Sequence, residues 1–156
     1  MSDEQRVFFP GDDRLEAMLG WPRDDDVAGG VVIAHPYPPH GATMALPVVF
    51  RIAKSCRERH LATLRFNFRG VEGSLGTFSG TEEHRDVAAA GEFLRGRLAG
   101  LDGEAVPGPT TLPVALAGYS FGSIMAARAA AGLGYVRALA LVGFAVDWSD
   151  VPLDTY

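Results

Sequence analysis

The sequence predicts an α/β fold: a three-layer sandwich in which an N-terminal β-hairpin precedes a mainly parallel sheet. After residue 30, short apolar runs alternate with stretches of helical periodicity, the order expected when helices connect the strands of a parallel sheet. The apolar runs are continuous rather than alternating, which is typical of strands buried on both faces. With 156 residues, we expect a single domain over 1–156.

The elements follow from periodicity and turn residues. Residues 5–9 and 14–21 form a hairpin around 10–13; in its second arm Leu15, Ala17 and Leu19 alternate with Arg14, Glu16 and Met18, which predicts a half-buried strand. A helix over 79–98 begins at the capping-box pair Ser79 and Glu82. The remaining predicted elements are strands at 31–34, 61–68, 112–117 and 135–143, the last one buried, and helices at 43–59 and 121–133.

A glycine-flanked serine lies between an apolar strand and a small-residue helix. The stretch Gly118-Tyr-Ser-Phe-Gly122 fits the pattern G-x-S-x-G, a nucleophile elbow. In such a turn the serine has a strained backbone, and the glycines avoid collisions of a Cβ with neighbouring backbone. The turn lifts Ser120 clear of the sheet and directs the N–H of Phe121, at a helix N-terminus, toward whatever the serine attacks.

Several loops with polar residues follow strands of the predicted sheet. They are 35–41, 69–78, the turn at Ser120 and the segment that holds Asp147. Ligands of such sheets bind beyond the carboxyl ends of the strands, so we expect one site where these loops meet.

Composition excludes other classes of partner. The net charge of −5 favours neither nucleic acid nor an anionic membrane, and no apolar run approaches the ~20 residues that span a bilayer. The acidic start is not a signal peptide, and the lone Cys56 excludes an internal disulfide, so a cytoplasmic location is expected. The spacing of Gly70, Gly73 and Gly76 is not that of a nucleotide loop, and no cluster has metal-ligand spacing, so we predict no cofactor and no metal.

Three stretches together resemble the α/β-hydrolase superfamily, in particular its small lidless bacterial members. They are His35-Pro-Tyr-Pro38, Arg65-Phe-Asn-Phe-Arg-Gly-Val-Glu-Gly-Ser-Leu-Gly76 and Gly118-Tyr-Ser-Phe-Gly122. The resemblance implies an α/β-hydrolase-like sandwich with an oxyanion hole formed by the N–H groups of Tyr37 and Phe121.

The chain departs from that family after Ser120. The family's triad runs serine, acid, histidine along the chain, whereas His35, His40, His60 and His84 all precede Ser120. We therefore expect a C-terminally truncated domain that lacks the last two strands with their acid and histidine. Asp147 is a candidate acid, and His35 is a candidate base or, alternatively, an organiser of the oxyanion loop.

These observations leave two alternative functions for the chain. The first is a serine hydrolase, of esterase, thioesterase or amidase type, that acts on a small acyl substrate through Ser120. The alternative is a catalytically incomplete hydrolase-fold module or fragment that binds a ligand or partner without turnover. Because the strand at 135–143 would be an apolar sheet edge, we also expect self-association through it.

Overall fold

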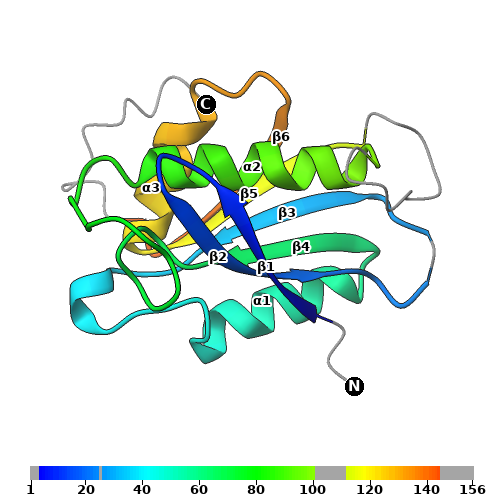
Figure 1. The fold of residues 1–156 in the computed structure, drawn as a ribbon. Coiled ribbons are helices and arrows are strands. Elements are labelled where there is room, and N and C mark those ends of the chain that lie inside the picture. Colours follow the sequence, from blue (N-terminus) through cyan, green and yellow to red (C-terminus); the bar gives the residue numbers. More distant parts are fainter. Residues whose placement is uncertain (1–3, 25, 101–111, 145–156) are drawn as a thin grey trace.

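The computed structural model describes residues 4–24, 26–100 and 112–144. Its centre is a six-stranded sheet with the order β1-β2-β4-β3-β5-β6 (Figure 1). The strands β3, β4, β5 and β6 are parallel, and the hairpin β1–β2 is antiparallel to them. The strands are β1 (Glu4–Pro10), β2 (Arg14–Gly20), β3 (Gly29–Ala34), β4 (Leu61–Phe66), β5 (Val114–Tyr119) and β6 (Val136–Val142). The predicted mainly parallel sheet with an N-terminal hairpin is confirmed.

Helices cover both faces of this sheet. They are α1 (Pro47–Arg57), α2 (His84–Leu98) and α3 (Phe121–Ala130), with a short 3-10 helix η1 (Pro38–His40). In Figure 1, α2 and α1 lie on opposite sides of the sheet. The larger core joins α2 and α3 to one face, and a smaller one packs Val49 and Ala53 of α1 against Val31 and Ile33 of β3. The molecule therefore has three layers.

The helices begin where local chemistry dictates. The first starts at Pro47, later than the predicted residue 43, because proline suits the first helical position. The second helix starts at His84, later than the predicted residue 79. The Ser79 N–H donates to a carboxylate oxygen of Glu83 (2.7 Å), whereas the capping-box pattern predicted Glu82 in that role. On this helix the apolar residues Val87, Ala90, Leu94 and Leu98 are buried.

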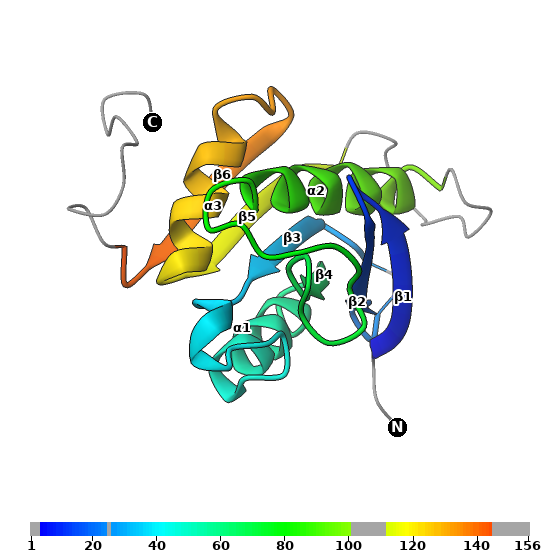
Figure 2. The same cartoon turned by 60° about the vertical axis from the view of Figure 1, so that its left-hand side comes forward.

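Two predictions of burial are wrong. Glu16, expected on the open side of β2, is 0% exposed, because the loop after β4 folds over that side and bonds to its carboxylate. The last strand, expected to be buried, is half exposed. It is the outermost strand of the described sheet, at the edge opposite β1 (Figure 2). Its Leu139 and Leu141 pack against the larger core, whereas Ala138, Ala140 and Val142 are exposed.

No helix in the described part of the chain is long and apolar enough to cross a membrane.

Candidate active site

Ser120 lies in the turn that joins β5 to α3. Its backbone has φ 53° and ψ −119°, a conformation that strains any residue with a Cβ. Hydrogen bonds hold it there: its N–H donates to the Val142 carbonyl (2.8 Å), and its own carbonyl accepts from the Ser123 N–H (2.9 Å). The strain that the sequence pattern predicts at this serine is therefore present and is supported from β6 and from α3.

The two glycines around Ser120 allow close approach of backbones. A Cβ on Gly118 would overlap the peptide between Gly122 and Ser123. A Cβ on Gly122 would overlap the carbonyl oxygens of Ala34 and His35. The second contact brings the start of α3 against the end of β3, where the loop with Tyr37 begins. Gly122 thus sets the spacing between the two segments that hold the predicted oxyanion donors.

A hollow of about 360 Å³ opens beside Ser120. Its walls come from the loop after β3, from the end of β5 and from the turn after β6. They are formed by Pro36, Tyr37, His40, Gly41, Ala42, Leu46, Tyr119, Ser120 and Gly143. The described residues that line it are mostly apolar or aromatic and include no carboxylate, lysine or arginine. Such a hollow suits a small uncharged group next to the serine hydroxyl.

Aromatic rings bring the predicted oxyanion residues together. The rings of Tyr37 and Phe121 meet edge to face with centroids 5.5 Å apart. Phe78, from the loop after β4, contacts both of them, at 5.5 and 5.6 Å. The loop after β3, the loop after β4 and the first turn of α3 therefore share one aromatic cluster next to the hollow.

His35 lies behind the loop and is fully buried. Its Nδ1 lies 2.8 Å from the Pro36 carbonyl, and its Nε2 accepts from the Phe68 N–H at 3.2 Å. Burial lowers its pKa from 6.5 to about 4, although the Pro36 carbonyl acts in the opposite direction. With both nitrogens engaged in a neutral ring, these contacts favour the loop-organising role over that of a base.

The other three histidines, none of which is a predicted site residue, have different surroundings. His40, at the end of η1, is exposed; it lines the hollow of Ser120 and meets the Tyr37 ring at 5.0 Å. His60 lines a different hollow near Trp21, and the Nδ1 of His84 lies 2.9 Å from the Thr81 carbonyl. Asp147 lies outside the described residues. Sequence reasoning missed His40 as a wall of the hollow, because an exposed loop residue carries no periodic signal.

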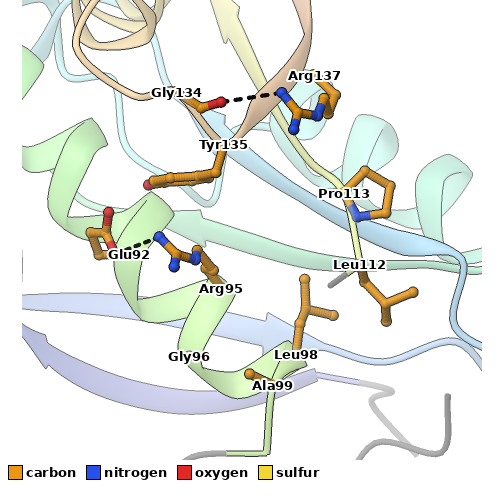
Figure 3. A pocket seen from close by; sticks show the side chains of 10 residues that line it. All are labelled: Glu92, Arg95, Gly96, Leu98, Ala99, Leu112, Pro113, Gly134, Tyr135 and Arg137. Carbon is orange, nitrogen blue, oxygen red and sulfur yellow. Dashed lines mark hydrogen bonds and ion pairs between the residues drawn. The ribbon is translucent and has the colours of Figure 1, made fainter. Parts of the chain in front are cut away.

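A larger cleft, of about 660 Å³, lies elsewhere (Figure 3). It is bounded by the last turns of α2 and by the residues that precede β5 and β6. Its charged side chains are engaged locally: Arg95 lies over the Tyr135 ring at 4.9 Å and 3.7 Å from a Glu92 oxygen, and Arg137 donates to the Gly134 carbonyl. This cleft is thus at the amino ends of the strands, away from Ser120.

Among the described residues, no group of three or more histidine, cysteine, aspartate or glutamate side chains is placed to hold a metal ion.

Comparison with solved structures identifies the fold. An α/β serine hydrolase homologue from Coxiella burnetii is 29% identical with a TM-score of 0.74, over 90% of this chain and 63% of its own. A lidless α/β serine hydrolase from Xanthomonas campestris is 30% identical with a TM-score of 0.73, over 90% of this chain and 61% of its own. A candidate α/β hydrolase of unknown function from Agrobacterium tumefaciens is 26% identical with a TM-score of 0.79. The match covers 94% of this chain and 63% of that structure's chain.

The chain spans 61–63% of the length of these three structures. No protein-family model matches it, and no curated protein does. The likeness nevertheless extends over 90–94% of this chain and agrees with its mainly parallel sheet. The chain therefore has an α/β-hydrolase-like fold and is similar to small bacterial α/β serine hydrolases.

Proposed function

We propose that the chain is the nucleophile-bearing part of a serine hydrolase that acts on a small ester, thioester or amide. The observation that carries this proposal is Ser120, held at φ 53° between β5 and α3 beside a hollow whose described lining includes no carboxylate, lysine or arginine. A strained serine at this point is the geometry of a nucleophile elbow.

In the proposed reaction Ser120 Oγ bonds to the substrate carbonyl carbon and its proton passes to a base. The carbonyl π electrons move to the oxygen, which becomes the oxyanion. The N–H groups of Tyr37 and Phe121 would donate to that oxygen, and one such donor contributes about 2.7–4 kcal/mol of transition-state stabilisation. Collapse of this intermediate expels the alcohol, thiol or amine, which takes up a proton, and water then releases the acyl group.

The base has two candidate sources. Of the four histidines, His40 is the one that lines the Ser120 hollow, and it would be the acceptor that the described residues offer. The other source is a residue outside the described part, since the relatives are longer than this chain. Asp147 remains the candidate acid.

The second candidate function is a hydrolase-fold module that binds without turnover. It is favoured by two observations: within the described residues no carboxylate lines the Ser120 hollow, and His35 has both nitrogens engaged. Such a module would keep the hollow and the strained serine but would not activate the hydroxyl.

Labelling with a fluorophosphonate probe separates the two. We expect the purified 156-residue chain to be labelled and the Ser120→Ala variant to stay unlabelled. A His40→Ala variant that folds but no longer reacts would identify the base, whereas unchanged labelling would assign it elsewhere. A folded wild-type chain that is not labelled would exclude the hydrolase proposal for this chain and favour the binding module.

A further inference from the structure

The loop that lines the Ser120 hollow is fastened at both ends to one short segment. This loop, residues 35–46, runs from β3 to α1 and includes Tyr37. At its start, His35 Nε2 accepts from the Phe68 N–H (3.2 Å). At its end, the Met44 N–H donates to Asn67 Oδ1 (2.9 Å), and the Met44 carbonyl accepts from Arg65 Nη1 (2.8 Å). The end of β4 and the residues just after it therefore determine where the loop lies.

Asn67 connects this loop to the hairpin on its other side. Its Nδ2 donates to Glu16 Oε2 (2.9 Å), and the same oxygen accepts from the Gly73 N–H (2.8 Å). Ser74 Oγ accepts from the Glu16 N–H (2.9 Å) and donates to the Asn67 carbonyl (2.7 Å). Asn67 and Glu16 are 1% and 0% exposed. One buried amide thus joins three segments: the hairpin, the loop after β4 and the loop beside Ser120.

The charge of Glu16 fixes the direction of that amide. Burial raises the Glu16 pKa, but the hydrogen bonds from Asn67 and Gly73 and the charge of Arg6 outweigh it, so the pKa is below its usual value. An ionised carboxylate only accepts hydrogen bonds. The NH₂ group of Asn67 must therefore face Glu16, which leaves its oxygen to receive the Met44 N–H.

We propose that Asn67, oriented by Glu16, is a positioning residue that holds Tyr37 at the correct distance from Ser120. The inference rests on the proposed function, because Tyr37 matters there as an oxyanion donor. The contacts require an acceptor and a donor on one short side chain, which alanine lacks. Aspartate keeps the acceptor but would place a second carboxylate against Glu16.

The test uses the full 156-residue chain and two readouts. One is the rate of fluorophosphonate labelling of Ser120; the other is hydrogen exchange at the amides of Met44, His40 and Gly41. In Asn67→Ala we expect labelling to slow about a hundredfold, the effect of a misplacement of about 1 Å, and the Met44 amide to lose protection. The control Leu94→Ala opens a cavity under α2: it should lower the melting temperature but leave labelling of the folded protein within about threefold, because this buried apolar side chain makes none of the hydrogen bonds that fasten the loop.

A charge exchange makes the test specific. In Asn67→Asp with Glu16→Gln, the glutamine amide can donate to the aspartate while its oxygen accepts from Gly73. We expect this double variant to react at least about tenfold faster than Asn67→Asp alone. If Asn67→Ala does not fold, this pair decides the question, and equal rates would overturn the proposal.

The two proposals fail differently. Labelling of Asn67→Ala within about threefold of wild type, with the Met44 amide still protected, would overturn the positioning role but leave the hydrolase proposal intact. An unlabelled wild-type chain would refute the hydrolase proposal. Hydrogen exchange alone would then decide the positioning role: loss of protection at the His40, Gly41 and Met44 amides in Asn67→Ala supports the fastening of the loop, and unchanged protection overturns it.

Discussion

Gly122 is where the start of α3 touches the end of β3. An added Cβ would overlap the carbonyl oxygens of Ala34 and His35, and backbone atoms cannot rotate away. We expect Gly122→Ala to lower the free energy of unfolding by about 1–3 kcal/mol and to slow labelling of Ser120. Urea denaturation and probe labelling measure the two effects. Gly134→Ala is the matched control: a Cβ there meets nothing within 4 Å, so stability should stay equal or rise. Equal stability and equal labelling rates in Gly122→Ala and Gly134→Ala would contradict the close approach of α3 to the end of β3.

His35 makes stability depend on pH. Burial lowers its pKa from 6.5 to about 4, so between these values the unfolded chain binds a proton that the folded protein does not. The contribution of the neutral His35 to the free energy of unfolding is fully present above pH 6.5 and is lost as the pH falls toward 4. The total loss is about 3 kcal/mol. Unfolding free energies from pH 7 to 4.5 should show this loss in wild type but not in His35→Gln. An NMR titration that finds the His35 ring protonating near its ordinary value would contradict it.

At the scale of elements, a buried ion pair joins the loop after β4 to α2. Both Asp86 oxygens accept from Arg69, the shortest bond being 2.6 Å, and both side chains are nearly buried. Asp86→Ala would leave a buried guanidinium without its main partner, which typically costs about 3–5 kcal/mol. Chemical denaturation tests this. The control is Lys54→Ala, which removes an exposed pair with Glu58 and should change stability by less than about 0.5 kcal/mol. A small effect at Asp86 would mean that Asp12, which also contacts Arg69, replaces it.

The elements were largely predictable, because each depends on local patterns. Continuous apolar runs identified the parallel strands, and the G-x-S-x-G stretch identified the turn in which Ser120 has a positive φ. Contacts distant in sequence were not predictable. Glu16 reads as a solvent-facing strand residue, and only the fold brings Asn67, 51 positions later, onto its carboxylate. Likewise β6 reads as a buried strand from its composition, but burial depends on which neighbours the sheet supplies.

At the scale of the whole molecule, the two edges of the sheet differ. The β1 edge is polar at its start and carries Glu4, whose carboxylate pairs with Arg57 and Arg65. Strand β6 carries Ala138, Ala140 and Val142 on the sheet face opposite the larger core. On that face α1 packs on β3 and β4 and leaves these three residues exposed. An outer strand with exposed apolar side chains is a template for pairing with another strand.

We therefore propose that the purified chain self-associates through β6. Pairing of two β6 strands would satisfy their outer backbone groups, so sedimentation velocity should show a concentration-dependent dimer or larger species. Ala140→Lys places a charge in the middle of that edge and should shift the population to monomer, because charged side chains block edge pairing. Gln5→Lys, an exposed position on β1, is the matched control and should leave the distribution unchanged. A wild-type chain that is monomeric at every concentration would refute the pairing, and equal dissociation by both lysines would indicate a general charge effect.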